Sequence, residues 1–227
     1  MAEKPLFKAI KALIPLLIRF DVQNGDYIPP EGGLLMTSNH ISRLDTPLLM
    51  AITDRTDLVA IVAKKYQTKP FFKWILEKIG TMIWMDREKM DFSAVKEALD
   101  HLRRGDAIGI APEGTRSHQS TGLLEGKQGA AVLAARGGVS ILPVGIHGSD
   151  KIYQHWMKLR RPPVTVRIGK PYDLPEMDMD DRQAWLSEST DEIMCRIAAL
   201  LPPEYRGFYS DHPRLKALLA EGSENES

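Results

Sequence analysis

Short apolar runs alternate with longer segments of helical periodicity along most of the chain. The apolar runs predict strands at residues 34–38, 58–63, 81–85, 107–111, 141–146 and 164–168. The segments between them predict helices at residues 47–52, 70–79, 92–104, 128–136 and 182–201. Because strands and helices alternate in this way, we expect an α/β fold with a single mixed sheet flanked by helices.

The predicted helix at residues 92–104 carries the clearest end signals. Asp91 or Ser93 can cap its first turn, and Gly105 stands where a C-terminal glycine in the left-handed conformation belongs. Three apolar side chains share one face of this helix: Val95, Leu99 and Leu102. This face predicts packing against the sheet.

The first twenty residues predict an amphipathic helix. Its apolar residues recur at helical spacing: Leu6, Phe7, Ile10, Leu13, Ile14 and Leu17. Basic residues interrupt them: Lys4, Lys8, Lys11 and Arg19. The segment is too short and too charged to span a bilayer, and it lacks the small-residue cleavage site of a signal peptide. It either lies in a membrane interface or packs on the protein's own core, and we favour the interface.

The rest of the chain predicts one domain followed by a short extension. The alternating pattern fills residues 21–205, with no internal repeat and no strong linker. Residues 206–227 form a C-terminal extension. Its last eight residues, AEGSENES, have the composition of a disordered tail.

The overall composition excludes several classes of protein. The chain has 30 basic and 30 acidic side chains, a balance that argues against nucleic acid as a partner. Its one cysteine, Cys195, cannot form an internal disulfide and lies in an apolar helical run, so we expect a buried thiol and a reducing compartment. No Cys/His cluster has zinc spacing, and we expect no metal.

The stretch SNHISRLD, at residues 38–45, sets His40 five residues before Asp45. It joins a predicted strand to a helix that we expect to start with Thr46 as N-cap and Pro47 at the first helical position. Residues five apart do not share a face of a helix, but in a loop the carboxylate can reach the imidazole. It would then fix the tautomer and leave the other ring nitrogen as a base. Alternatively, Asp45 only caps the helix and His40 is an ordinary loop histidine.

The stretch APEGTRS, at residues 111–117, follows another predicted strand. Ligand sites of α/β proteins lie at the carboxyl ends of strands, so this loop and the histidine loop can share a crevice. It carries groups that suit an anion: the Arg116 guanidinium, the Thr115 and Ser117 hydroxyls, and Gly114, which allows close approach to the backbone. Alternatively, the loop is a solvated turn in which Arg116 pairs with Glu113.

Further cations follow two other predicted strands: Lys64, Lys65 and Arg87. Cations at several strand ends form a pattern, although any one of them is more often a surface charge. Two competing motifs fail. The stretch GLLEGKQ, at residues 122–128, is one residue short of a Walker loop and ends in Gln, and there is no Gly-x-Ser-x-Gly elbow. Nucleotide hydrolysis and serine-hydrolase chemistry are therefore disfavoured.

Taken in order, these stretches resemble the glycerolipid acyltransferase family typified by 1-acylglycerol-3-phosphate acyltransferases. Four motifs within residues 34–147 carry the resemblance: Asn39-His40-x-Ser42-x-x-Asp45, Gly80 through Asp86-Arg87, Pro112-Glu113-Gly114-Thr115-Arg116-Ser117 and Leu142-Pro143-Val144-Gly145. Each motif is weak by itself, whereas four in order are specific. Trp84-Met85 and Ala111 depart from the family pattern at positions that resemble pocket wall, which bears on chain or acceptor preference more than on reaction type.

The resemblance implies transfer of a fatty acyl group from acyl-CoA or acyl carrier protein to the sn-2 hydroxyl of lysophosphatidic acid, giving phosphatidic acid without a cofactor. It implies that His40 is the base and that Asp45 orients it. The implied substrate-binding residues are Glu113, Gly114, Thr115, Arg116, Lys64 and Arg87. The implied location is the cytoplasmic face of a membrane, with the N-terminal helix as a peripheral or monotopic anchor.

Other functions stay open at this point. The acceptor could be another lysolipid or glycerol 3-phosphate, with the same chemistry. A non-catalytic module would keep only lipid and membrane binding, although a pure binder has no use for an oriented base. Trp74, Trp84 and Trp156 could line an apolar groove for the acyl chain, or could be ordinary core and surface aromatics.

Overall fold

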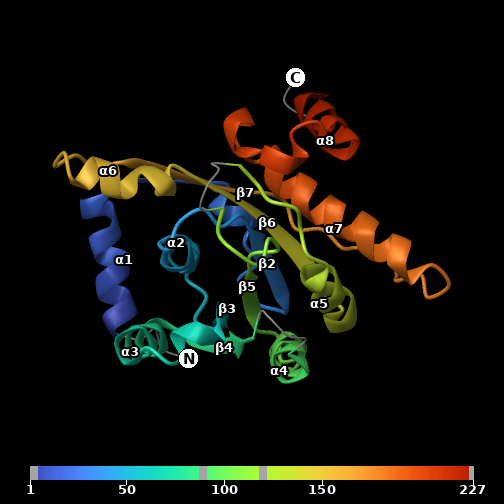
Figure 1. Ribbon diagram of the computed structural model, residues 1–227, viewed down its shortest axis with the longest axis horizontal. Helices are drawn as coiled ribbons and strands as arrows, with labels where there is room; N and C mark the ends of the chain where they lie inside the picture. The colour runs from blue at the N-terminus through green and yellow to red at the C-terminus, as the bar shows by residue number, and fades with distance from the viewer. Residues whose placement is uncertain (1–4, 87–90, 118–121, 225–227) are drawn as a thin grey trace.

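The computed structural model describes residues 5–86, 91–117 and 122–224. One seven-stranded sheet runs through it, with the strand order β1-β7-β6-β2-β5-β3-β4 (Figure 1). The strands are β1 (Arg19–Gln23), β2 (Leu34–Ser38), β3 (Leu58–Ala63), β4 (Thr81–Met85), β5 (Ala107–Ile110), β6 (Ser140–His147) and β7 (Pro163–Ile168). All neighbouring pairs are parallel except β6 and β7. The predicted single mixed sheet is confirmed.

Helices cover both faces of this sheet (Figure 1). They are α1 (Pro5–Leu17), α2 (Asp45–Ala51), α3 (Pro70–Ile79), α4 (Phe92–Arg103), α5 (Gly129–Gly137), α6 (Ile152–Trp156), α7 (Arg182–Ala199) and α8 (Pro213–Glu224). On one face, α4, α5 and α7 enclose a core cluster that includes Leu35. On the other, α1, α2, α3 and α6 enclose a second cluster that includes Leu34 and Met36. Alternate residues of β2 thus enter opposite cores, which explains its continuous apolar sequence.

Strand polarity decides which loops can meet. β2 lies between β5 and β6 and is parallel to both. The loops that follow β2 and β5 therefore leave the sheet at the same edge, side by side. Helix α4 also forms as predicted: the Asp91 carboxylate accepts a hydrogen bond from Ala94 N, and Gly105 has a φ of +91°. The buried, free thiol expected at Cys195 is observed.

The N-terminal helix is shorter than predicted. It ends at Leu17, and Arg19 and Phe20, which we expected to be helical, belong to strand β1. β1 pairs with β7, and the Arg161 side chain donates hydrogen bonds to the carbonyls of Pro15 and Ile18 at the end of α1. These contacts with residues far away in the sequence end the helix. They cannot be predicted from the local apolar periodicity. Within the described ranges no helix is both long and apolar enough to cross a bilayer.

Three other predictions about elements were wrong or incomplete. Helix α2 begins at Asp45 rather than after a Thr46 cap, because the Asp45 carboxylate turns back onto the preceding loop. The short helix α6 was not predicted. The disordered tail was predicted from residue 220, yet α8 continues to Glu224 because its fully buried Leu215 and the partly buried Leu218 pack into the first core cluster. Residues 225–227 of that tail lie outside the described residues.

Candidate active site

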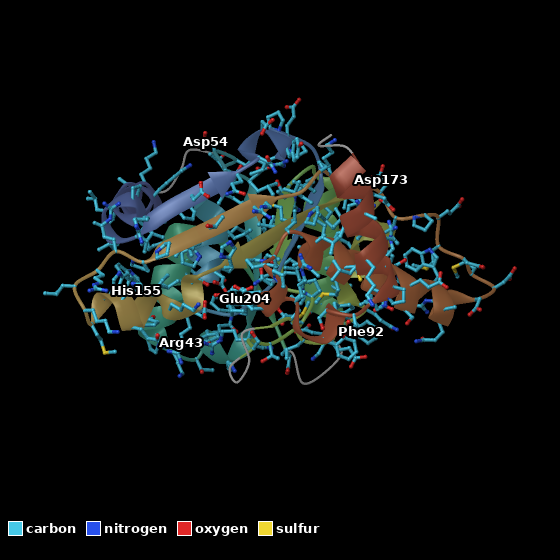
Figure 2. The ribbon with its side chains drawn as sticks, turned by 90° about the horizontal axis from the view of Figure 1, so that it is seen from above. Arg43, Asp54, Phe92, His155, Asp173 and Glu204 are labelled. Atoms are coloured by element: carbon cyan, nitrogen blue, oxygen red, sulfur yellow. The ribbon has the colours of Figure 1, made fainter. Side chains whose placement is uncertain are left out.

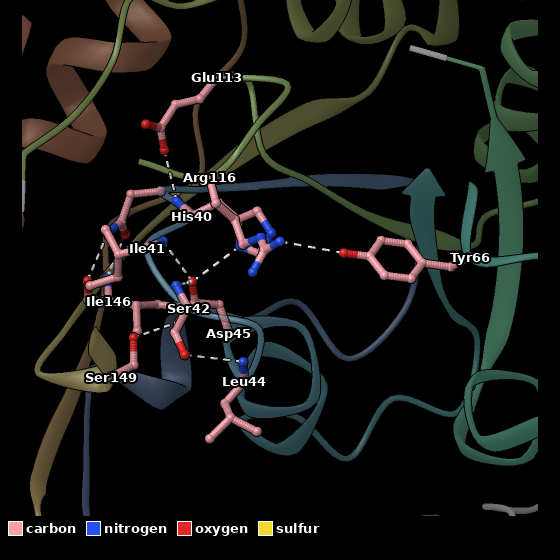
Figure 3. Close-up of polar contacts among 11 residues, drawn as sticks. His40, Ile41, Ser42, Leu44, Asp45, Tyr66, Glu113, Arg116, Ile146 and Ser149 are labelled. Atoms are coloured by element: carbon pink, nitrogen blue, oxygen red, sulfur yellow. Dashed lines mark hydrogen bonds and ion pairs between the residues drawn. The ribbon is translucent and has the colours of Figure 1, made fainter. Parts of the chain in front are cut away.

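The candidate site is built where the loops after β2 and β5 meet (Figure 3). His40, in the first loop, uses both of its backbone groups to hold the second. Its N–H donates to Glu113 Oε1 at 2.7 Å, and its carbonyl accepts from Ser117 N at 3.1 Å. The two stretches singled out in the sequence are therefore joined by two hydrogen bonds at the carboxyl edge of the sheet.

His40 and Asp45 do meet, as their spacing and the loop context predicted. His40 Nδ1 lies 3.1 Å from Asp45 Oδ2, and both side chains are largely buried (Figure 3). A carboxylate can only accept, so Nδ1 carries the proton in this contact. The neutral imidazole then keeps the lone pair on Nε2, which is the arrangement a general base requires.

The Asp45 carboxylate is held by more than the histidine. Its Oδ2 also accepts from the backbone N–H groups of Ile41 and Ser42, at 2.8 and 2.7 Å. Its Oδ1 accepts from the Ser149 hydroxyl at 2.6 Å. Ser149 was not among the residues predicted from the sequence. The available signal was its position two residues after β6, at the same carboxyl edge as the two loops.

Asn39 anchors the same loop to the neighbouring strand. Its side-chain amide donates to the carbonyl of Ile146 and accepts from the N–H of Ile146, both at 2.7 Å. The fully buried amide thus continues the β2–β6 pairing by one step beyond the last residue of β2. These two hydrogen bonds fix the point at which the chain leaves the sheet, and so they fix the position of His40, the next residue.

Glu113 braces the loops rather than pairing with Arg116. Its Oε1 accepts from His40 N, its Oε2 accepts from Leu124 N at 2.9 Å, and the side chain is buried. Burial raises the pKa of this carboxyl to about 7, and the negative charge of Asp45 adds to the rise. Glu113, which the family resemblance implied as a substrate-binding residue, therefore has the geometry of a brace between the two loops.

Arg116 points past His40 toward the opposite wall of the site (Figure 3). Its Nη2 donates to the Tyr66 hydroxyl at 3.4 Å, so the solvated Arg116–Glu113 turn considered above does not form. In the same loop Gly114 has a φ of +69°, and Thr115 is exposed. Ser117 Oγ is buried and has no hydrogen-bond partner among the described residues, which leaves it to a water or a ligand.

Lys127 is a cation at this loop that the sequence analysis did not single out. A Cβ added at Gly114 would lie 2.9 Å from its Cδ and 3.2 Å from its Nζ, so the lysine side chain lies across the loop. Its backbone N–H donates to Pro112 O at 2.9 Å, which fixes the position of the lysine. The stretch that failed as a Walker loop therefore still brings an ammonium group to the candidate site.

Of the other predicted cations, Lys64 is related to this loop only indirectly. Lys64 begins a short 3₁₀ helix, Lys64–Tyr66, and so lies near Arg116 only through Tyr66. Its own charge acts on Asp91, whose pKa is lowered to about 2 by the Ser93 hydroxyl, by two backbone N–H groups and by Lys64. Arg87 lies outside the described residues.

A narrow cavity of about 40 Å³ opens beside His40. Its polar end is formed by Ser38, His40, Asp45 and Thr46. Beyond them the wall is apolar. It is formed by Leu49 and Met50 of α2, by residues 58–61 of β3 and by residues 109–111 at the end of β5 and just after it. Fold and site together define a protein that holds an oriented base between a cationic loop and an apolar cavity. Such a site is suited to deprotonating a hydroxyl group of an anionic, chain-bearing substrate.

Comparison with known proteins assigns the family. The family model described as Acyltransferase matches residues 19–147, more than half of the 227-residue chain, so this chain belongs to the acyltransferase family. The chain also resembles the crystal structure of a 1-acyl-sn-glycerophosphate acyltransferase from Thermotoga maritima. The TM-score is 0.59 and the identity 23%, with 82% of this chain and 76% of that chain covered. At that identity the likeness supports the fold.

Relatives of known sequence give finer comparisons. A 1-acyl-sn-glycerol-3-phosphate acyltransferase of Borreliella burgdorferi is 29% identical over 138 residues, which cover 60% of this chain and 54% of that protein. One from Bacillus subtilis is 25% identical over 192 residues, 81% of this chain and 90% of that protein. A lyso-ornithine lipid O-acyltransferase of Pseudomonas aeruginosa is 33% identical over 119 residues, which cover 52% of this chain and 44% of that protein. The matched region thus spans about half of the first and third relatives.

The raised pKa of Glu113 predicts how stability depends on pH. In the unfolded chain this carboxyl ionises near its ordinary value of 4.5, and in the folded chain near 7. The folded state therefore binds more protons between these pH values, and the free energy of unfolding falls as the pH rises through this range. We expect Glu113→Gln to reduce that loss by at most roughly 3 kcal/mol.

Urea unfolding measured at half-unit steps from pH 4.5 to 7.5 checks this prediction, with Glu97→Gln as control because Glu97 is an exposed carboxylate on α4. The quantity to compare is the slope against pH, since the amide also replaces a hydrogen-bond acceptor by a donor. Parallel curves for the native protein and Glu113→Gln would refute the assignment.

Proposed function

We propose that the protein transfers a fatty acyl group from acyl-CoA or acyl carrier protein to the sn-2 hydroxyl of 1-acyl-sn-glycerol 3-phosphate, giving phosphatidic acid. The observation that carries the proposal is the Asp45-oriented His40 beside the loop that bears Arg116. The names of the Borreliella and Bacillus relatives support this acceptor.

In this reaction His40 is the general base. Its Nε2 takes the proton of the sn-2 hydroxyl as that oxygen attacks the thioester carbonyl carbon. The C–S bond then breaks, and the leaving thiolate takes the proton from Nε2, which restores the neutral imidazole. Asp45 stabilises the imidazolium that exists between the two proton transfers, and no covalent enzyme intermediate is needed.

The acceptor's phosphate would bind at the loop of residues 112–117. The Arg116 guanidinium and the Lys127 ammonium both lie at this loop, and the family resemblance adds Thr115, Lys64 and Arg87 to the candidates. A phosphate held there fixes the glycerol, so that binding at a distance orients the hydroxyl toward His40. The cavity beside His40 would take the acyl group being transferred. It must widen for a long chain, and the Met50 thioether is the flexible part of its wall.

We infer that the protein works at a membrane surface. Ile10 and Ile14 pack α1 onto the second core cluster, while Leu13, Leu16 and Leu17 are 48%, 69% and 42% exposed. Packing on the core and contact with a membrane interface are therefore compatible, because each would use a different face of this helix.

A second exposed segment adjoins the end of α1. Met157 and Leu159, just after α6, are 82% and 98% exposed, and the neighbouring Lys158 and Arg160 are exposed as well. Trp156 Nε1 donates to Leu17 O at 3.1 Å and so ties this segment to α1. The segment with His155 forms one end of the molecule (Figure 2). Apolar and basic side chains together suit an anionic lipid surface.

The first test is product analysis by mass spectrometry, with lysophosphatidic acid vesicles and acyl-CoA or acyl carrier protein donors. We expect phosphatidic acid, and we expect His40→Ala to lower the rate by about 100- to 10,000-fold. The chain offers a matched control: His101 also precedes an aspartate by five residues, and its Nδ1 lies 2.7 Å from Asp106 Oδ2, so His101→Ala should retain activity. Lipid binding without transfer from either donor would favour the binding module.

A second test concerns the acceptor. If Arg116 binds the phosphate, Arg116→Ala should raise KM for lysophosphatidic acid by about 10- to 100-fold, the cost of losing a charged hydrogen bond. The exposed Arg103 of α4 provides the control variant, Arg103→Ala. The Pseudomonas relative makes lyso-ornithine lipid the second candidate acceptor. Faster turnover of that phosphate-free lipid, untouched by Arg116→Ala, would select it and overturn the phosphate assignment.

A third test concerns the membrane. Leu16→Glu should weaken sedimentation with anionic vesicles several-fold, because it places a charge among acyl chains and anionic headgroups. It should leave the melting temperature unchanged, since Leu16 is mostly exposed. Met179→Glu is the control, at a similarly exposed methionine outside this surface. A fall in melting temperature without a loss of vesicle binding would make α1 a structural helix only.

A further inference from the structure

Helix α2 has two mostly apolar faces, and each borders a different cavity. Thr46, Leu49 and Met50 line the narrow cavity beside His40. Leu44, Pro47 and Leu48 line a second cavity, on the side of α1 and α6. Both sets have the spacing i, i+3, i+4 that places residues on one face of a helix. The short helix is thus a partition between two apolar spaces, and its first residue is Asp45.

The second cavity has a volume of about 120 Å³ and a lining of apolar residues. Its inner wall includes Ile152 of α6, which is buried, and Trp156. Its outer rim is formed by Leu13 and Leu17 of α1, each roughly half exposed, so the cavity reaches the surface. The rim residues belong to the face of α1 that we place against lipid.

We propose that this second cavity binds the hydrocarbon chain that the acceptor already carries, apart from the chain being transferred. The inference rests on the proposed function, in which two chains and one glycerol meet at His40. The cavity beside His40 ends at the base and suits the incoming acyl group. The acceptor's chain needs a separate path. Leu44, just before Asp45, and Pro47 and Leu48, just after it, line the second cavity, so this cavity begins within three residues of the carboxylate that orients His40.

The size of the cavity sets what it can hold. An apolar cavity of about 150 Å³ binds a benzene ring, so 120 Å³ accommodates a segment of a chain rather than all of it. The remainder would run out between Leu13 and Leu17 into the lipid surface. Each methylene buried contributes roughly a fourfold gain in affinity, so even a short buried segment selects acceptors by chain length.

Filling the cavity from its rim tests the proposal. Leu13→Trp is suitable because Leu13 is half exposed, and Leu16→Trp is the matched control because Leu16 is on the same helix but not in the lining. With acceptors presented as monomers, Leu13→Trp should raise KM for oleoyl lysophosphatidic acid about tenfold. It should leave KM for the hexanoyl analogue and the donor chain preference unchanged. Equal effects on both acceptors, or none, would overturn the proposal.

A binding measurement keeps this test separate from catalysis. In the His40→Ala protein, monomeric lysophosphatidic acid with a brominated chain should quench tryptophan fluorescence, and Trp156→Phe should remove most of that quenching. If the lipid quenches the fluorescence but the native protein does not catalyse acyl transfer, the chain-binding role of the cavity would stand and the proposed reaction would be rejected. Quenching that persists in Trp156→Phe, or that requires brominated phospholipid vesicles, would assign the chain to another place or to the bilayer and overturn the proposal.

Discussion

The candidate active site depends on one buried carboxylate, that of Asp45. Asp45 receives hydrogen bonds from the His40 ring, from two backbone N–H groups of the loop and from the Ser149 hydroxyl. An aspartate with fewer hydrogen-bond partners would be more mobile and would orient the imidazole less firmly, or it would leave a buried oxygen unsatisfied. Here the groups that satisfy the carboxylate also shape the loop, so the His40 ring is positioned before any substrate binds.

The sequence allowed the local part of this arrangement to be predicted. The interval between His40 and Asp45, with a strand before it and a helix after it, was enough to place His40 in a loop at the edge of the sheet and Asp45 at the start of the helix. Ser149 and the bracing by Glu113 were not predictable in the same way. Ser149 lies 104 residues from Asp45, and Glu113 lies 73 residues from His40, so each contact depends on the strand order β6-β2-β5. Such an order is a property of the tertiary fold, which one-dimensional periodicity does not encode.

Spacing alone also fails to separate two similar pairs in this chain. His101 and Asp106 have the same five-residue interval and a shorter ring-to-carboxylate distance than His40 and Asp45. They differ in where they lie: Asp45 comes after β2, whereas Asp106 comes immediately before β5. The second pair therefore lies at the amino edge of a parallel sheet, where α/β proteins do not build ligand sites. Strand polarity, and not the motif, distinguishes a candidate base from a structural histidine.

Helix α2 connects the candidate base to both cavities. The helix begins with Asp45, places one face against the sheet cavity and the other against α1, and ends at Ala51. A rotation of this helix would move the carboxylate that orients the base and would open one cavity at the expense of the other. In the proposed reaction, the positions of the base, the incoming chain and the acceptor's chain would therefore all depend on this one helix. A substitution in either cavity wall is expected to affect chain selection and base geometry together when it moves the helix, and chain selection alone when it only changes the volume.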